Sequence, residues 1–316
     1  MMKRKLGSSG IEVSPLAFGG NVFGWTIDQP TSFQLLDAFV DFGLDLIDTA
    51  NMYSAWVPGN QGGESETIIG NWLASSGKRG KVVIATKVGM PMGDGSKGLK
   101  KDYILKSVED SLKRLQIDVI DLYQSHEDDP TTPLDETLEA YQSLIQSGKV
   151  RSIGASNYTA ARLQEALTIS QDNQLPSYVT LQPEYNLYDR EGFESGLQQQ
   201  CVENNIGVIS YYSLASGFLT GKYRSQEDAS KSVRGGSITG KYLNDRGLRI
   251  LEALDNVAKA HRTVPAVISL AWLIQRPAIV APIASATSVS QLSELVKSVE
   301  LELTPEQVQL LDQAST

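Results

Sequence analysis

The sequence predicts an α/β fold, a barrel of eight parallel strands each followed by a helix, on three observations. Short apolar runs rich in β-branched residues alternate with longer amphipathic stretches. There are eight such pairs, and no shift in composition separates one pair from the next. Strands that alternate with helices pair in parallel through helical crossovers, and eight such units close into a (β/α)8, or TIM, barrel.

The expected elements follow one another along the whole chain. We expect strands at residues 16–18, 44–47, 82–86, 119–123, 152–155, 179–182, 207–211 and 279–282. We expect helices at residues 31–42, 64–74, 102–115, 135–147, 160–170, 191–204, 244–261 and 289–298. Strand segments such as VVIAT and GVISY are apolar throughout, which is typical of strands buried on both faces. The sequence therefore predicts a single barrel domain over residues 1–316.

Two further segments are recognised by their glycine and serine residues. Residues 3–14 (KRKLGSSGIEVS) predict an N-terminal β-hairpin that plugs one end of the barrel. The segment 232–240 is rich in Gly and Ser and predicts a mobile loop. An open doubly wound sheet is the rival fold, but GGNVFG at 19–24 lacks the G-x-G-x-x-G spacing and GFLTGK at 217–222 is one residue short of a P-loop.

Composition narrows the class of protein. Apolar residues make up 41% of the chain and charged residues 21%, so a sizeable core can form and wholesale disorder is excluded. The net charge of −9 argues against binding to nucleic acid or to an anionic membrane. One cysteine, Cys201, excludes an internal disulfide framework and a Cys-rich zinc site. The basic N-terminus is not followed by an apolar run, and the apolar stretch 266–274 is too short to span a bilayer, so we expect a cytoplasmic protein.

Polar side chains follow almost every expected strand. Asp48 ends the second strand, with Tyr53 five residues later; Lys87 ends the third and His126 follows the fourth. The carboxyl ends of all strands in such a barrel meet at one rim, so we expect these side chains to lie together. The later strands present Ser156, Asn157, Gln182 and Tyr211 at the same rim.

The charges at this rim are expected to interact. An ammonium in an apolar environment is costly unless it is paired, so Lys87 requires a carboxylate such as Asp48. A nearby cation favours the phenolate, so we expect Lys87 to lower the pKa of Tyr53 from its ordinary value of about 10. Tyr53 could then donate a proton to a carbonyl oxygen whose carbon accepts a hydride, while His126 holds the same oxygen. The chain has only one other histidine, His261, expected at a helix end, so no metal site is predicted.

Several segments resemble, in order, those of the aldo-keto reductases, and the resemblance covers essentially the whole chain. The segments are KLGSSGIEVSPLAFGG, DFGLDLIDTANMY with GGESETIIG, ATKVG, LYQSHEDD, GKVRSIGASNY, LQPEYNLYDR and ISYYSLASGFLTGKY. They are most similar to bacterial members that resemble potassium-channel β subunits. The resemblance implies reversible, NADP-dependent reduction of a small aldehyde or ketone.

The resemblance also implies roles for particular residues. Tyr53 is the implied general acid, with Lys87, Asp48 and His126 completing a catalytic tetrad. Ser156, Asn157 and Gln182 are implied to bind the nicotinamide carboxamide, and Tyr211 to stack on its ring. The other implied cofactor contacts are Gly20, Asn21, Leu214, Ser216, Gly217, Lys222, Arg234, Ser285, Thr287, Gln291 and Glu294. The expected substrate contacts are Trp25, Met52 and Trp56.

Three alternatives stay open. The stretch Ser285–Ser288 (SATS) lacks the basic residue frequent in the family, and a 2′-phosphate prefers a cation, so NAD is possible unless Lys222 or Arg234 compensates. The channel relatives suggest a cofactor-binding regulatory subunit with vestigial catalysis. A barrel aldolase using Lys87 as a Schiff base is a third reading. A homo-oligomer is possible.

Overall fold

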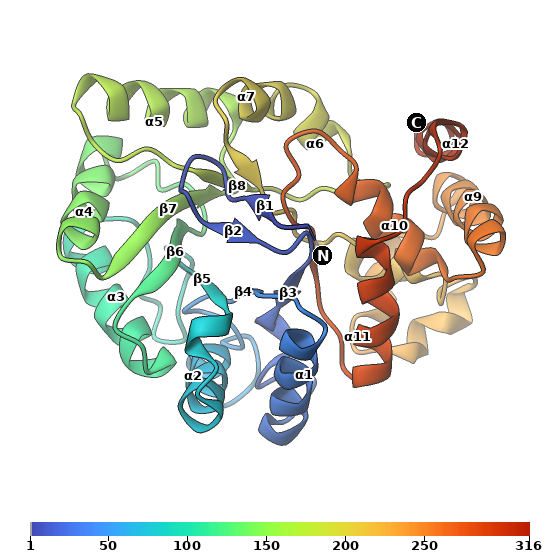
Figure 1. Ribbon diagram of the computed structural model, residues 1–316, viewed down its shortest axis with the longest axis horizontal. Helices are drawn as coiled ribbons and strands as arrows, with labels where there is room; N and C mark the ends of the chain where they lie inside the picture. The colour runs from blue at the N-terminus through green and yellow to red at the C-terminus, as the bar shows by residue number, and fades with distance from the viewer. Residues whose placement is uncertain (1) are drawn as a thin grey trace.

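Eight parallel strands curl around a common axis in the computed structural model, which describes residues 2–316 (Figure 1). Neighbouring strands pair in the order β10-β3-β4-β5-β6-β7-β8-β9. The Val208–Ile279 bridge and the 2.9 Å bond from Ile283 N to Ser210 O join the two edges. This confirms the predicted barrel. The strands are β3 (Ala17–Gly19), β4 (Leu46–Asp48), β5 (Val83–Val88), β6 (Ile120–Ser125), β7 (Val150–Ser156), β8 (Thr180–Gln182), β9 (Gly207–Val208) and β10 (Ile283–Ala284).

The last strand differs from its prediction at 279–282. Ile279 makes only an isolated bridge to Val208 of β9, and the regular strand β10 begins at Ile283, paired with Ala17 of β3. Pro282 separates the two pairings, and proline has no N–H for a ladder hydrogen bond. The ladder with β3 therefore starts only at Ile283, while the β9 side is contacted on both sides of Pro282, through the Val208–Ile279 bridge and the bond from Ile283 N to Ser210 O.

Helices surround the barrel (Figure 1). Several of them start at a side-chain cap: Asp28 accepts a hydrogen bond from Thr31 N at the start of α1, and Thr159 accepts one from Arg162 N at the start of α5. The predicted helix 191–204 is two helices, because Ser195 and Gly196 are not helical. The helices at or near predicted positions are α1 (Gln29–Asp41), α2 (Glu64–Ser76), α3 (Lys101–Leu115), α4 (Leu134–Gln146), α5 (Ala160–Asp172), α6 (Glu191–Glu194), α7 (Leu197–Glu203), α9 (Asp245–His261) and α11 (Val289–Val296).

Three helices lie outside the predicted set. The expectation of a mobile loop at 232–240 is wrong, because α8 (Gly235–Tyr242) occupies most of it. Buried Ile238 and Tyr242 anchor this helix, and the Tyr242 ring stacks on Phe218 with centroids 5.5 Å apart. Tertiary packing therefore overrides the low helix propensity of its glycines. The other two are α10 (Pro265–Ile274) and α12 (Pro305–Ala314). Within residues 2–316, no helix is both long enough and apolar enough to cross a membrane.

An N-terminal hairpin closes the barrel end opposite the carboxyl ends of the strands. Its strands β1 (Arg4–Lys5) and β2 (Glu12–Val13) pair antiparallel, as predicted. Leu6, Ile11 and Val13 are buried against residues that point into the barrel, including Leu46 and Ala85. The hairpin therefore fills one barrel end and leaves the other rim for polar residues.

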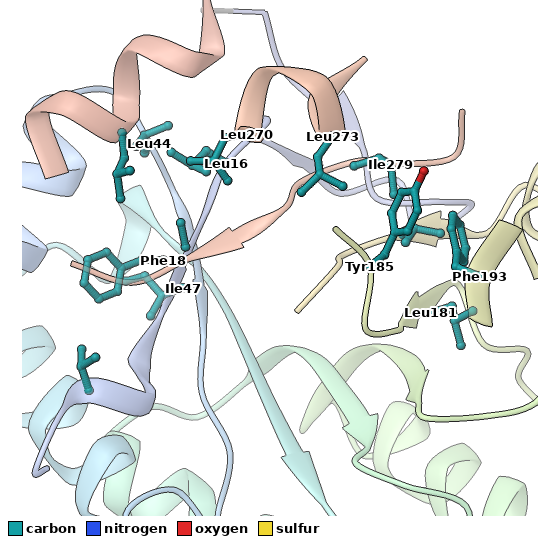
Figure 2. Packing of buried hydrophobic residues seen from close by; sticks show 14 of the residues in the cluster. Leu16, Phe18, Leu44, Ile47, Leu181, Tyr185, Phe193, Leu270, Leu273 and Ile279 are labelled. Carbon is teal, nitrogen blue, oxygen red and sulfur yellow. The ribbon is translucent and has the colours of Figure 1, made fainter. Parts of the chain in front are cut away.

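The main apolar core lies between the strands and the surrounding helices. Phe18 of β3 and Ile47 of β4 pack there with Leu270 of α10 and other apolar side chains (Figure 2). Because side chains alternate along a strand, Ile47 faces this outer layer while Leu46 belongs to the smaller cluster inside the barrel. The same alternation directs the next residue, Asp48, inward.

Candidate active site

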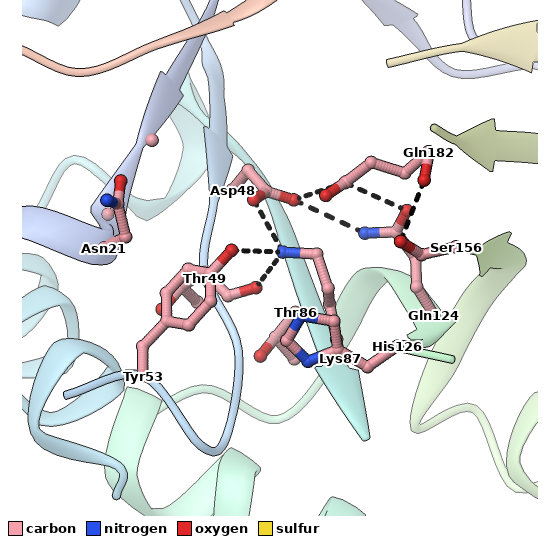
Figure 3. Close-up of polar contacts among 12 residues, drawn as sticks. Asn21, Asp48, Thr49, Tyr53, Thr86, Lys87, Gln124, His126, Ser156 and Gln182 are labelled. Atoms are coloured by element: carbon pink, nitrogen blue, oxygen red, sulfur yellow. Dashed lines mark hydrogen bonds and ion pairs between the residues drawn. The ribbon is translucent and has the colours of Figure 1, made fainter. Parts of the chain in front are cut away.

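Three charged or polar residues reach the barrel interior through the same alternation. Leu46, Ala85 and Leu122 lie in the apolar cluster inside the barrel, and Asp48, Lys87 and Gln124 follow each of them two residues later. All three of these polar side chains are buried. The sheet thus places a carboxylate, an ammonium and an amide above the apolar plug, at the carboxyl ends of adjacent strands (Figure 3).

Lys87 is the centre of the hydrogen-bond network at this rim. Its Nζ donates to Asp48 Oδ2 over 2.6 Å, to the Thr49 carbonyl over 2.8 Å and to the Tyr53 hydroxyl over 3.0 Å (Figure 3). An ammonium has three N–H donors, so these partners account for all of them. Lys87 is therefore fixed in position, and the Tyr53 hydroxyl is one of its three hydrogen-bond acceptors.

The loop after β4 holds Tyr53 in this position. Asn51 N donates to the Lys87 carbonyl over 3.1 Å, and Ser54 Oγ donates to the Phe23 carbonyl over 2.8 Å. Ser54 has a left-handed backbone, with φ of 74°, which is uncommon outside glycine. The loop is thus attached on both sides of Tyr53, and the Tyr53 ring lies 5.8 Å from the His126 ring.

The expected lowering of the Tyr53 pKa is wrong in its net direction. Burial raises the pKa of Tyr53 above its ordinary value; Lys87 acts to lower it, but burial and the Asp48 charge outweigh this effect. Burial by itself disfavours the Lys87 ammonium, yet the attraction of Asp48 and Tyr53 raises the Lys87 pKa. At neutral pH the site therefore holds a protonated phenol beside a charged ammonium.

His126 is a neutral imidazole at neutral pH. Burial, and secondly the charge of Lys87, lower its pKa well below the ordinary value. Its Nδ1 is buried without a hydrogen-bond partner among residues 2–316. Since buried polar atoms are rarely left unpaired, this imidazole has unused hydrogen-bonding capacity at the rim.

The lowered pKa of His126 predicts that the folded protein loses stability as the pH falls. Below about pH 6.5 the unfolded chain binds a proton at residue 126 that the folded protein does not bind. The free energy of unfolding should then fall as pH falls, with a contribution from His126 of up to about 1.4 kcal/mol per pH unit. Urea unfolding between pH 5 and 8 measures this. The slope should be smaller in His126→Gln and retained in His261→Gln; equal slopes in all three proteins would contradict the prediction.

Polar residues of β7, β8 and the segment after β9 form the other half of the rim. Ser156 Oγ donates to the Gln182 carbonyl over 2.8 Å, and Asn157 Nδ2 donates to the His126 carbonyl over 2.9 Å. The Tyr211 hydroxyl in turn donates to Asn157 Oδ1 over 2.8 Å. Asn157 is thus oriented by both of its neighbours, and its backbone is left-handed, with φ of 58°. The structure brings all four expected residues together beside His126.

The turn after β9 brings a left-handed stretch of backbone close to a lysine. Ala215, Ser216 and Gly217 are consecutive left-handed residues, with φ of 48°, 57° and 100°. A Cβ added at Gly217 would lie 3.9 Å from the Lys222 ammonium, so backbone and cation approach closely there. The N–H groups of Ala215 and Gly217 donate to the Tyr212 and Leu214 carbonyls, over 2.7 and 2.8 Å. The Lys222 ammonium is therefore the group of this turn that could hold the pyrophosphate of a dinucleotide.

The first and last strands meet through Ser285. Its Oγ lies 2.8 Å from both the Gly19 carbonyl oxygen and Asn21 Oδ1, and its single proton can be donated to either. Asn21 lies with Gly20 in the single 3₁₀ turn after β3. Farther along, Gln291 Oε1 accepts from both the backbone N and the side-chain Oγ1 of Thr287, over 3.0 Å each. The structure thus brings together Asn21 with Ser285 and Thr287 with Gln291.

Two expected cofactor residues are engaged elsewhere. The Glu294 carboxylate accepts from Lys297 Nζ over 2.6 Å and from Thr263 Oγ1 over 3.3 Å. The Arg234 guanidinium lies over the Trp25 ring, 5.1 Å from its centroid. Arg234 is therefore placed beside an expected substrate residue.

The expected substrate residues Trp25 and Trp56 form an aromatic series with Tyr53. The Trp25 and Trp56 rings are 5.5 Å apart, and the Trp56 and Tyr53 rings are 5.9 Å apart. Trp56 is 43% exposed, which is high for its type. Met52, the third expected contact, is half-buried in the same loop. An apolar surface with an exposed Trp56 thus adjoins the Tyr53 ring.

Comparison with known proteins decides the family. A model of the Aldo/keto reductase family matches residues 15–316. The chain belongs to the aldo/keto reductase family. It is 35% identical to an uncharacterized oxidoreductase of Bacillus subtilis (YrpG), over 97% of this chain and 94% of that protein. It is 31% identical to a probable voltage-gated potassium channel subunit beta of Arabidopsis thaliana, over 95% and 92% of the two chains. It is 30% identical to an L-glyceraldehyde 3-phosphate reductase of Escherichia coli O157:H7, over 99% and 92%.

Family membership makes this aldo/keto reductase an NAD(P)H-dependent oxidoreductase acting on carbonyl groups.

Gln124 is a buried polar residue at the rim of this reductase that was not predicted from the sequence. Gln124 Oε1 accepts from Gln182 Nε2 over 3.3 Å, and Gln124 Nε2 donates to Asp48 Oδ1 over 3.4 Å. Gln182 Nε2 also donates to the same Asp48 oxygen, over 2.9 Å. Counting inward-facing positions along 120–125 would have identified Gln124.

Proposed function

We propose that this protein is an NADP-dependent reductase of an aldehyde or ketone, working reversibly, within a single catalytic domain spanning 1–316. One observation carries the proposal. A buried ammonium, Lys87, contacts a carboxylate at 2.6 Å and a phenol at 3.0 Å, at the rim where barrel enzymes hold their catalytic residues. In this arrangement Tyr53 is the general acid, Lys87 and Asp48 support it, and His126 orients the carbonyl.

The proton in the reduction comes from Tyr53. Its raised pKa keeps the hydroxyl protonated, which a general acid requires. As the proton moves from the Tyr53 oxygen to the carbonyl oxygen, negative charge develops on the phenol. The Lys87 ammonium is already 3.0 Å away and stabilises that charge, and Asp48 keeps Lys87 charged.

His126 and the exposed aromatic rings position the substrate. The neutral imidazole donates a hydrogen bond to the carbonyl oxygen without bringing in a second positive charge beside Lys87. Trp25 and Trp56, with Met52, supply apolar surface for the rest of the molecule. The hydride for the carbonyl carbon would be supplied by a reduced nicotinamide dinucleotide when one is bound.

The rim residues fit a dinucleotide. Ser156, Asn157 and Gln182 lie together at this rim as the residues that would bind the carboxamide, with the half-buried Tyr211 ring beside them. The Lys222 ammonium beside the left-handed turn suits the pyrophosphate. Support for NADP over NAD comes from the N-terminus of α11, which follows Thr287, since helix starts bind phosphate. Fluorescence titration should give a lower Kd for NADPH than for NADH; the reverse order would show NAD preference.

A regulatory role remains the second candidate because of the similarity to a probable potassium channel subunit. Turnover of NADPH by the isolated protein separates the two. We expect at least one aldehyde in a panel to be reduced without a partner; tight NADPH binding with no turnover would favour the regulatory subunit.

An aldolase mechanism is disfavoured by the geometry. A Schiff-base lysine attacks as the neutral amine, whereas the Lys87 pKa is raised and its three donors are all engaged. Borohydride should therefore trap no substrate on Lys87.

Because Gln124 contacts both Gln182 and Asp48, we predict that it affects both cofactor binding and catalysis. Replacing Gln124 by Leu removes the acceptor that holds the Gln182 amide, so we expect the NADPH Kd to rise about two- to tenfold, as for one lost hydrogen bond. The kcat should fall in the same variant, because Asp48 loses a donor. The exposed Gln146→Leu variant, on α4, is the matched control. Unchanged Kd and kcat in Gln124→Leu would contradict this role.

A further inference from the structure

Four buried hydroxyl groups form a chain behind the rim, on the outer side of the sheet. Ser125 Oγ, at the end of β6, lies 2.8 Å from the Tyr141 hydroxyl on α4 and 3.0 Å from the hydroxyl of Tyr178, shortly before β8. The Tyr178 hydroxyl lies in turn 3.2 Å from the hydroxyl of Tyr158, in the turn between β7 and α5. None of these four residues is more than 3% exposed. Side chains from four separate segments of the sequence therefore meet around Ser125.

Hydrogen bonding, rather than packing, accounts for this chain. Burial raises the pKa of Tyr141, Tyr158 and Tyr178, so all three phenols stay protonated and each can donate one hydrogen bond while accepting another. Tyr123 lies beside Tyr141, with ring centroids 6.0 Å apart, yet its hydroxyl has no partner among residues 2–316. Packing of the rings thus does not by itself bring hydroxyl groups together. A buried serine hydroxyl is favourable only when it is bonded, so its bonds explain Ser125 in this apolar layer.

This chain joins two residues of the candidate site. Ser125 directly precedes His126, and Tyr158 directly follows Asn157. On the inner side of the rim, Asn157 Nδ2 donates to the His126 carbonyl over 2.9 Å. Behind the rim, the two residues are connected a second time, through Ser125, Tyr178 and Tyr158. The ends of the neighbouring strands β6 and β7 are therefore held together on both sides (Figure 1).

The position of the His126 imidazole depends on its backbone. Its Nδ1 has no hydrogen-bond partner among residues 2–316, so no bond at that atom orients the ring. The backbone is held by His126 N, which donates to the Val88 carbonyl over 2.8 Å, and by the bond from Asn157 to the His126 carbonyl. Ser125 is the preceding residue, and its side chain fixes the same piece of backbone from behind. A shift of β6 at Ser125 would thus move the imidazole.

We propose that Ser125 and Tyr178 are positioning residues for carbonyl reduction: their hydroxyls, with that of Tyr158, hold His126 at a fixed distance from Asn157. His126 is proposed to orient the carbonyl and Asn157 to bind the cofactor carboxamide, so this spacing determines how the two reactants face each other. Neither Ser125 nor Tyr178 touches the reacting atoms, because both side chains lie in the layer between the sheet and the helices. The inference rests on the proposed reduction.

Two phenylalanine variants with the same chemical change test it. Tyr178→Phe breaks the path between Ser125 and Tyr158, whereas Tyr141→Phe removes an equally buried hydroxyl that also contacts Ser125 but lies off that path. Each variant is made in the wild type and in His126→Gln. The readouts are kcat and KM for a reducible aldehyde, the NADPH Kd by fluorescence titration and the free energy of unfolding in urea.

Tyr178→Phe should lower kcat by about three- to thirtyfold, because a misplacement of about 1 Å can cost about a hundredfold in rate and the expected shift is smaller. The NADPH Kd should rise about two- to tenfold through Asn157, as for one weakened hydrogen bond. In the His126→Gln background the loss in kcat should disappear, since the group that it misplaces is gone, while the rise in Kd should remain. Tyr141→Phe should leave kcat and Kd as in its parent, even if it unfolds more easily.

A loss of kcat by the same factor in both backgrounds would overturn the inference, because a purely structural role acts whether or not His126 is present. Equal effects of Tyr178→Phe and Tyr141→Phe on kcat and Kd, or no change of either in Tyr178→Phe, would overturn it too. If Tyr178→Phe does not fold, Tyr158→Phe takes its place, since it removes only the last bond of the path. Absence of turnover in the wild type would instead overturn the proposed function, and the NADPH Kd would still test the connection to Asn157.

Discussion

Tyr53→Phe should lower kcat for aldehyde reduction by about 10²- to 10⁴-fold, the range that a positioned general acid contributes. The substitution removes one hydroxyl and keeps the ring, so the contacts of Tyr53 with Trp56 and His126 remain. The NADPH Kd should stay nearly unchanged, because the residues proposed to bind the cofactor lie on other strands. Steady-state kinetics and fluorescence titration measure the two effects.

The chain offers a matched control for this variant. Tyr123 is fully buried, and its hydroxyl has no hydrogen-bond partner among residues 2–316. Tyr123→Phe removes the same atom where it makes no bond, and kcat should not fall. A Tyr53→Phe variant as active as Tyr123→Phe would rule out Tyr53 as the proton donor.

Breaking the Lys87–Asp48 pair should cost both stability and activity. Lys87→Met leaves the Asp48 carboxylate buried without its cation, and Asp48→Asn leaves the ammonium without its carboxylate. Removing one partner of a buried pair typically destabilises a protein by about 3–5 kcal/mol. We therefore expect a loss of that size in each single variant, measured by urea unfolding, and a large loss of kcat.

The double variant separates the two effects. Asp48→Asn with Lys87→Met leaves no uncompensated charge, so most of the stability should return, less the cost of the unpaired Thr49 carbonyl. Activity should not return, because nothing stabilises charge on Tyr53. The exposed pair Lys106–Asp110 is the control, and Lys106→Met should unfold as the wild type does. Additive losses in the double variant would show that the two side chains are not energetically coupled.

Much of the candidate site at the barrel rim could be predicted from the sequence. Asp48, Lys87 and His126 were predicted to lie together because parallel strands in a barrel end on one side, and this holds whatever the details of packing. Gln124 was missed because it lies before the end of its strand, where only the inward or outward direction of each side chain shows that it reaches Asp48. Contacts set by strand order were predictable; contacts set by side-chain direction required the structure.

Other features depend on which groups are buried in the folded protein, and a short stretch of sequence does not show this. The Tyr53 pKa was expected to fall because Lys87 is close, but the loop also buries the hydroxyl, and desolvation has the larger effect. Helix α8 forms from a glycine-rich segment because Ile238 and Tyr242 are buried. The shift of the last strand to Ile283 has a cause in the sequence, Pro282, although which neighbour each residue pairs with depends on barrel closure.

The central claim is that a protonated Tyr53 beside Lys87 supplies the proton for carbonyl reduction. The single-turnover rate of NADPH oxidation, followed as a function of pH in the wild type and in Tyr53→Phe, tests it most directly. Since the acid form is the active one and burial raises the Tyr53 pKa, the wild-type rate should be constant through the neutral range and fall only above about pH 10. That alkaline decline should be absent from the residual rate of Tyr53→Phe. A wild-type rate that rises with pH, or an identical decline in both proteins, would contradict the claim.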